Sequence, residues 1–306
     1  MPKTTTALLF ILAGGFLAFS VKAQEPDGSR LKPAERNRTG TLRQLIPGYY
    51  VFSSTSFNSG VIATSEGVVV LDALTSEMIA RQERETIAGV IKQPVRFLVS
   101  STFHNNYTWG NVAYQDVIKI GHEDYRTGLL AQMQRDRASP DEQRARLPQI
   151  TFRDRLTIHL GGKEIQVLHL GKGHTRGDSI IFVPQDRIAY VSELFFSDQF
   201  LYINDGYAVS WLKTLGAVEA LPADIFVPGH GPIPTDPKET RQGLHRFRHM
   251  LVDLCDAVQK EIARGATEDQ AAASVQLPQY EKMQGYKSQR EVAVRRTYRE
   301  MMGTLK

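Results

Sequence analysis

The chain has 306 residues, of which 42% are hydrophobic and 23% are charged. That composition is typical of a globular protein, and the length is sufficient for one large domain or two small ones with a sizeable core. The formal net charge of +4 falls to +2 without residues 1–23, which carry Lys3 and Lys22. So small an excess argues against a general binder of nucleic acids or other polyanions.

The first 23 residues have the three parts of a secretory signal peptide. Lys3 precedes an apolar run over residues 7–19, and Val21 and Ala23 stand at the −3 and −1 positions of a cleavage site. The alternative is an uncleaved anchor, but a helix that spans a membrane needs about 20 apolar residues. We therefore expect cleavage after Ala23 and a periplasmic or secreted protein without a stable membrane anchor.

The chain has a single cysteine, Cys255, and so cannot form an internal disulfide. Leu251, Leu254 and Val258 lie at helical spacing around it. We expect Cys255 to be a small core residue rather than a catalytic thiol.

The first half of the chain alternates strand and helix patterns. Residues 24–42 are polar and are expected to form a flexible lead-in. Residues 49–74 hold short β-rich runs separated by turn signals, which predicts a meander of strands. Apolar residues at helical spacing predict a helix over 76–92, and the apolar run 95–100 predicts a buried strand.

The middle of the chain continues in the same way. A short strand is expected over 117–120 and a helix over 123–137, followed by a charged loop over 138–148. From residue 150 the chain again has several strand patterns, two of them joined by a hairpin turn at Gly161-Gly162.

The last third is mostly helical. A helix is expected over 208–221, with Trp211 on its apolar face, and the run 224–227 predicts the last strand. From residue 240 onward the pattern is helical. Two halves, each with strands followed by helices, indicate layers of helices flanking central sheets.

Four polar segments each follow an apolar strand, over residues 101–111, 173–178, 191–195 and 227–232. They carry three histidines and an acid: His104, His174, Glu193 and His230. Neutral imidazole is the commonest protein ligand for zinc, iron and copper. Because strand ends meet at one rim of a layered fold, these residues predict a metal site there.

The order, spacing and surroundings of these segments resemble the metallo-β-lactamase superfamily over about residues 43–235. The resemblance implies an α/β fold, the αββα sandwich, with a zinc site at the edges of its sheets. Residues 236–306 would then form a C-terminal helical extension packed on the same domain.

The first motif of that family is His-x-His-x-Asp-His, followed two residues later by Gly-Asn or Gly-Gly. With Gly110-Asn111 as the register, its four positions hold Thr102, His104, Asn106 and Tyr107. Only His104 retains the family residue.

The later motifs are better preserved. His174 fits the third histidine loop, Gly-His-Thr-x-Gly-Asp, and His230 fits the final Gly-His-Gly. Glu193 stands at the place of the bridging Asp. The resemblance implies His104, His174, His230 and Glu193 as metal ligands. Asp178 would brace its loop or a histidine ring.

In the family one ion is held at the positions of Thr102, His104 and His174, and the other at those of Asn106, Tyr107 and His230. Threonine hydroxyl, asparagine amide and tyrosine phenol are poor zinc ligands.

We therefore expect one ion at most, zinc or else iron or manganese. The alternative is a metal-free pocket, in which the three histidines are hydrogen-bonded to Tyr107, Asn106 and Glu193. Asn106 would hold a water but cannot take its proton, which leaves Glu193 as the candidate base.

These residues favour an exported metal-dependent hydrolase that uses metal-activated water on a small ester, lactone, amide or thioester. The alternative from another class is an inactive member that binds a small ligand in the former cleft. A nuclease fits poorly with export and a near-neutral charge. Hydrolysis of β-lactam antibiotics does not follow, because it depends on an intact site.

Other notable residues have simpler explanations. His122 is expected to cap or pack a helix, and His159 and His169 lie in strand patterns and are expected to be structural. Four aromatic residues are expected either at the mouth of the pocket or in the core. They are Trp109, Phe195, Phe196 and Phe200.

Overall fold

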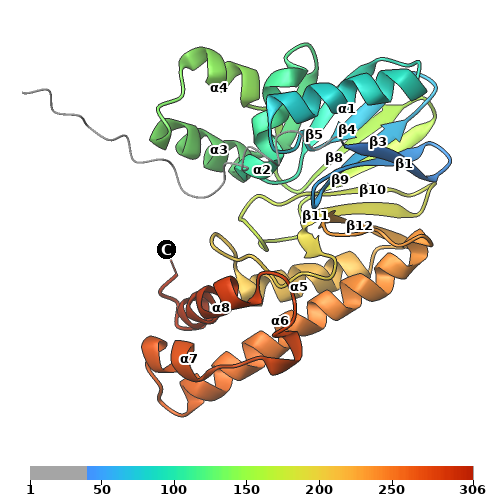
Figure 1. The fold of residues 1–306 in the computed structure, drawn as a ribbon. Helices are drawn as coiled ribbons and strands as arrows, with labels where there is room; N and C mark the ends of the chain where they lie inside the picture. The colour runs from blue at the N-terminus through green and yellow to red at the C-terminus, as the bar shows by residue number, and fades with distance from the viewer. Residues whose placement is uncertain (1–39, 306) are drawn as a thin grey trace, which may run out of the picture.

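The computed structural model describes residues 40–305. The expected signal peptide and the lead-in up to residue 39 lie outside the described residues. Within them, β-strands in the middle of the molecule are covered on one side by α1 to α4 and on the other by α5 to α8 (Figure 1). The layered α/β architecture expected from the sequence is therefore confirmed.

Twelve strands form one continuously hydrogen-bonded sheet in the order β7-β6-β5-β4-β3-β12-β11-β10-β9-β8, with β1 and β2 attached through β3. The two halves of this sheet meet where β12 pairs with β3, at His230 and Phe57. The strands are β1 Thr41–Ile46, β2 Tyr49–Ser54, β3 Phe57–Ala63, β4 Val68–Leu71, β5 Val95–Ser100, β6 Ile118–His122, β7 Ile150–Phe152, β8 Arg155–Leu160, β9 Lys163–Leu168, β10 Ile180–Val183, β11 Ile188–Phe196 and β12 Ile225–His230.

The helices alternate with the strands along the chain. They are α1 Glu77–Val90, α2 Asn105–Thr108, α3 Glu123–Arg135, α4 Pro140–Arg146, α5 Ala208–Glu219, α6 Thr240–Ala263, α7 Glu268–Ser274 and α8 Tyr286–Met301. Short 3-10 helices are η1 Trp109–Tyr114, η2 Pro237–Glu239 and η3 Pro278–Tyr280.

Three apolar layers hold these elements together. One lies between the two halves of the sheet and includes Leu71 and Val99 from one half with Val167 and Val227 from the other. A second fills the space between the first half and α1. The third and largest packs α5, α6 and α8 on the second half.

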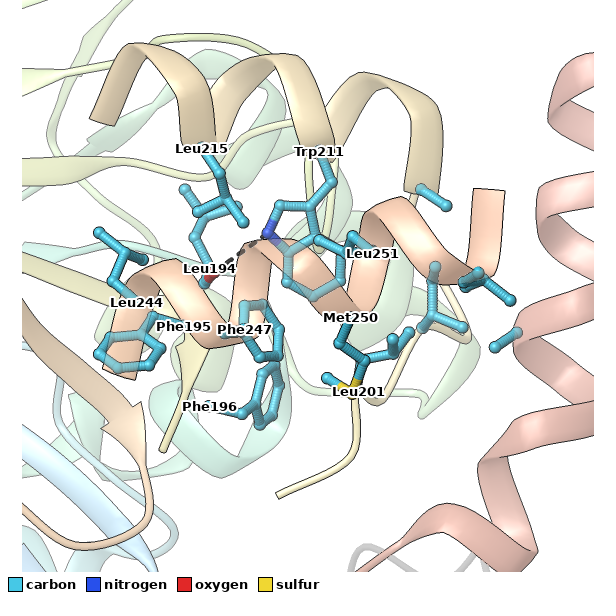
Figure 2. Close-up of a cluster of buried hydrophobic side chains, with 14 of the residues drawn as sticks. Leu194, Phe195, Phe196, Leu201, Trp211, Leu215, Leu244, Phe247, Met250 and Leu251 are labelled. Carbon is cyan, nitrogen blue, oxygen red and sulfur yellow. Dashed lines mark hydrogen bonds between the residues drawn. The ribbon is translucent and has the colours of Figure 1, made fainter. Parts of the chain in front are cut away.

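The third layer is centred on aromatic side chains (Figure 2). Trp211 of α5 is wholly buried beside Phe247 of α6, with ring centroids 5.6 Å apart. Its indole N–H donates a hydrogen bond of 3.1 Å to the carbonyl oxygen of Leu194 in β11. This bond satisfies the only polar atom of the side chain, so the tryptophan fixes α5 directly over the strand that carries Glu193.

Most of the expected elements are confirmed, but the prediction of a charged loop over 138–148 is wrong. Residues 140–146 form α4, which begins with a capping box in which Ser139 and Glu142 bond each other's backbone. Arg146 at the end of α4 is buried and donates to Thr108 at 3.2 Å. The charged residues of this segment therefore belong to a capped helix with a buried arginine, and not to a solvated loop. The hairpin turn at Gly161-Gly162 is confirmed, with φ of +54° and +82°.

One buried acid, Glu83 of α1, lies in the layer between the helix and the sheet. Its carboxylate accepts hydrogen bonds from the hydroxyls of Ser59 and, at 2.8 Å, of Tyr114. Burial outweighs these bonds and raises the pKa of Glu83 to about 8. A neutral, hydrogen-bonded carboxylic acid therefore fixes α1 against the sheet near neutral pH.

Candidate functional site

The four polar segments converge at the ends of the strands. His104 directly precedes α2 and ends the loop after β5, and His174 lies in the loop between β9 and β10. Glu193 is inside β11, and His230 is the last residue of β12. The pairing of β11 with β12 is irregular at Ser192, which has a φ of +53°. This irregularity lies beside Glu193, so the regular pairing of β11 with β12 is interrupted where the site begins.

Glu193 is at the centre of the arrangement and is wholly buried. One carboxylate oxygen, Oε2, lies 2.9 Å from His104 Nδ1 and 3.0 Å from His174 Nδ1. The other, Oε1, lies 3.0 Å from His230 Nε2 and accepts a 2.9 Å hydrogen bond from the Asn106 amide. The structure therefore brings together all four expected ligands, with His230 on the opposite oxygen from the other two histidines.

His174 is completely buried, and neither of its ring nitrogens has a hydrogen-bond partner. Its Nδ1 is close to Glu193 Oε2 but poorly aligned for a hydrogen bond. A buried polar atom left without a partner costs about 1–3 kcal/mol, so such an atom in a site calls for a ligand.

A metal ion fits these residues. One ligand atom each from His104, His174 and Glu193 can be chosen so that all three lie within 4.8 Å of one another. Two imidazole nitrogens and a carboxylate oxygen form a donor set suited to zinc, iron or manganese. Among the described residues this is the only such group of three or more.

Charge complementarity holds the cluster together. Burial alone would raise the pKa of Glu193, but His174 and His104 hold it well below its usual range. Burial alone would lower the pKa of His104, yet Glu193 and Asp205 raise it to about 10. Burial lowers the pKa of His230. Without a metal, the centre at neutral pH is therefore an ionised Glu193 beside a protonated His104 and a neutral His230.

Asp205 belongs to the site and was missed in the sequence. Its carboxylate lies 3.0 Å from His104 Nε2, and its side chain is 55% exposed. The hydrogen bond to His104 lowers the pKa of Asp205, so it is ionised. Arg296 of α8 donates to the carbonyl oxygen of the adjacent Gly206 at 3.0 Å, so the C-terminal helix helps to hold this loop.

The three positions that depart from the family motif have different surroundings. Asn106 donates to Glu193. Thr102 is buried and its hydroxyl has no hydrogen-bond partner. Tyr107 is wholly buried, its hydroxyl donates to the carbonyl oxygen of Gly229, and its ring meets the ring of His230 edge-on at 5.6 Å.

Asp178 has the bracing contacts expected of it. Its carboxylate accepts hydrogen bonds from Thr175, at 2.7 Å from the backbone N–H and at 2.6 Å from the hydroxyl. These bonds close the loop that follows His174.

Asp72, at the end of β4, was also missed and connects several strands. It accepts from the Ser101 hydroxyl at 2.6 Å, from Ser192 at 2.9 Å and from Tyr190 at 3.0 Å. Burial outweighs these bonds and raises its pKa to about 6. Ser101 and Ser192 each adjoin a residue of the site, so Asp72 fixes the two segments relative to each other.

Several other residues singled out in the sequence have structural contacts. His122 caps α3 by accepting the Asp124 backbone N–H at 3.1 Å, and the ring of His169 stacks on it. Phe195, Phe196 and Phe200 are buried in the core.

Phe196 also reaches the site, because its ring stacks on that of His230 with centroids 4.5 Å apart. Cys255 is buried and free. None of the described helices combines the length and the apolar character needed to cross a membrane.

Residues 56–230, more than half of the chain, match the family model of the metallo-beta-lactamase superfamily. The 2,4-dinitroanisole O-demethylase subunit alpha of Nocardioides sp. (strain JS1661) is 23% identical over 177 residues, which are 57% of this chain and 52% of that protein. A metallo-beta-lactamase type 2 of Bacteroides fragilis is 24% identical over 204 residues, 62% of this chain and 79% of that protein.

Among solved structures, the stereoselective inverting sec-alkylsulfatase Pisa1 of Pseudomonas sp. superposes with a TM-score of 0.68 and 16% sequence identity. The superposition covers 86% of this chain and 50% of that chain. This chain thus spans about half the length of both the demethylase subunit and the sulfatase. At this identity the likeness shows a shared fold.

Proposed function

Because the chain belongs to the metallo-β-lactamase superfamily, a family of metal-dependent hydrolases, we propose that it is an exported hydrolase with one transition-metal ion at most. His104, His174 and Glu193 hold the ion, and the substrate is a small ester, lactone, amide or thioester. His230 and Asn106 orient Glu193 from its other oxygen.

The observation that carries this proposal is the unpartnered imidazole of His174. The ring is completely buried, its Nε2 has no hydrogen-bond partner, and its Nδ1 has only Glu193 Oε2 nearby, at 3.0 Å. A purely structural histidine at such depth would be expected to have a partner for its N–H group. A cation beside Glu193 would give the ring a ligand bond instead.

When bound, the ion would act as a Lewis acid towards a carbonyl oxygen and lower the pKa of a water molecule. The protein residues have supporting roles. Asp205 accepts a hydrogen bond from His104 Nε2, which leaves Nδ1 directed at Glu193 and fixes the ring, as carboxylates do behind metal-bound histidines. Asn106 can place a water through its side-chain oxygen but cannot accept its proton.

The relatives support a small-molecule substrate without choosing one. By name they act on a nitroaromatic ether, a β-lactam and an alkyl sulfate. The reacting bond differs in each. The substrate class proposed here therefore rests on the chemistry of the site. A single Lewis acid beside the carboxylates of Glu193 and Asp205 favours attack of water on a polarised carbonyl group.

The second candidate is an inactive protein that binds a small ligand in the same place. It is favoured by the contacts of Glu193, whose two oxygens are already matched by His104, His230 and Asn106. In that case His104 keeps its proton and the charge of Glu193 is balanced without a metal.

Elemental analysis of the purified protein after dialysis separates the two candidates. We expect up to one zinc, iron or manganese ion per chain, lost in His104→Ala and in His174→Ala. His159→Ala, at an exposed strand position, is the matched control and should keep the ion. Two tightly bound ions per chain, or an ion that survives both substitutions, would contradict the ligand assignment. A protein without metal that binds a small ligand would support the second candidate.

A further inference from the structure

Two further histidines lie on α6, far along the chain from the candidate metal site. His245 and His249 are four residues apart, one helical turn, and both are exposed. Their Nε2 atoms face each other at 3.2 Å, and the ring centroids are 4.6 Å apart. Histidines at this spacing on one helix face are a known geometry for sharing a metal ion.

The separation of the nitrogens suits two ligands of one ion. Zinc–nitrogen bonds are about 2.0–2.1 Å long, so two imidazole nitrogens in adjacent positions on one ion lie about 3 Å apart. The Nε2 atoms of His245 and His249 are already at that separation, which reduces the entropy lost when they bind an ion.

Glu219, near the end of α5, orients the ring of His245 through a hydrogen bond. Its Oε1 lies 3.1 Å from His245 Nδ1, and its Oε2 lies 3.6 Å from the Arg248 guanidinium. The carboxyl oxygen Oε1 accepts this hydrogen bond, so Nδ1 of His245 is the donor and carries the proton. In the neutral ring this leaves the lone pair on Nε2, which faces His249. A carboxylate behind a histidine ligand also raises its basicity.

We propose that His245 and His249 form a two-histidine chelate for one divalent transition-metal ion on the outer face of α6. Neutral imidazoles favour nickel, copper and zinc, whereas magnesium and calcium prefer oxygen ligands. The other coordination positions face solvent, so the ion exchanges readily and is removed by dialysis, unlike an ion at the buried centre. Because the pair is preformed only when α6 is helical, the ion stabilises the folded helix.

The test is a titration of metal-stripped protein with nickel chloride, followed by calorimetry and by the midpoint of thermal unfolding. Beyond any nickel held at His104, His174 and Glu193, we expect one further, weakly bound equivalent and a rise in the midpoint that goes with it. This further equivalent and its rise should be lost in His245→Ala and in His249→Ala. Alanine favours helices and both positions are exposed, so the variants should fold, which circular dichroism checks. Glu219→Gln should weaken the binding about 10–100-fold. Copper should bind more tightly than nickel.

His159→Ala is again the matched control and should leave the titration unchanged. If both α6 variants bind nickel as the parent does, the pair only shares a hydrogen bond and the proposal fails. It also fails if one of the two substitutions abolishes binding and the other has no effect, because a chelate needs both rings.

Discussion

The central role of Glu193 can be tested by replacing it with glutamine. Glutamine has nearly the same shape, but it lacks the charge and presents an N–H₂ group where one carboxylate oxygen was. In the parent, Glu193 Oε2 lies 2.9 Å from His104 Nδ1 and 3.0 Å from His174 Nδ1. The substitution therefore leaves a protonated His104 without its buried counter-charge.

The size of the effect follows from burial. Glu193 is wholly buried, and breaking one partner of a buried ion pair typically costs about 3–5 kcal/mol. Hydrogen bonds to charged groups give a similar scale, about 1.5–3 kcal/mol each. We expect Glu193→Gln to lower the free energy of unfolding of the metal-stripped protein by about 3–5 kcal/mol, a large part of the about 5–15 kcal/mol of an ordinary domain.

Urea unfolding followed by circular dichroism measures this difference, provided that the m-value is unchanged. Asp205→Asn is the matched control, because Asp205 bonds the same histidine from a half-exposed position. Exposed ion pairs contribute at most about 1 kcal/mol, so this variant should stay close to the parent. A loss below about 1 kcal/mol in Glu193→Gln would refute an ionised, paired Glu193.

Two further predictions concern a buried acid and the altered motif. Glu83 takes up a proton on folding, since its pKa rises from 4.5 to about 8; the free energy of unfolding should therefore fall as the pH rises between these values, and Glu83→Gln should flatten the slope in urea midpoints. An equal slope in the variant would contradict this. Combining Thr102→His, Asn106→Asp and Tyr107→His should raise zinc binding towards two ions per chain, at a cost of about 1–3 kcal/mol from the lost packing and hydrogen bond of Tyr107. A folded triple variant with no more zinc than the parent would show that these loops do not rebuild the second subsite.

Much of the fold was predictable because its signals are local. Apolar spacing predicted α1 and α5, and short β-rich runs predicted β2 to β5. The helix α4 was not predicted because its seven residues are mostly charged, with no apolar stripe. What holds it is a capping box and a buried Arg146 that reaches Thr108, and the second of these is a contact between segments distant in the sequence.

The site was predictable only in part. Glu193 and the three histidines around it could be found because each lies at or after the end of an apolar run in the sequence, and the same rule would have found Asp72 after β4. Asp205 gave no such signal, since Asn204-Asp205-Gly206 resembles an ordinary turn. Its role depends on the long-range contact with His104, which no pattern of neighbouring residues encodes.

The departures from the motif do not weaken the two halves of the site equally. On the side of His104 and His174, two imidazoles face one oxygen of Glu193, and the neighbouring Thr102 hydroxyl is left without a partner.

On the side of His230, aromatic side chains pack around the imidazole ring. The ring of Tyr107 meets the imidazole of His230 edge-on, and its hydroxyl donates a hydrogen bond to the carbonyl oxygen of Gly229. The ring of Phe196 stacks on the same imidazole. Burial there lowers the pKa of His230 and leaves it neutral, as a hydrogen-bond donor to Glu193. We therefore expect the position of the second subsite to support Glu193 structurally, and any metal-dependent chemistry to belong to His104, His174 and Glu193.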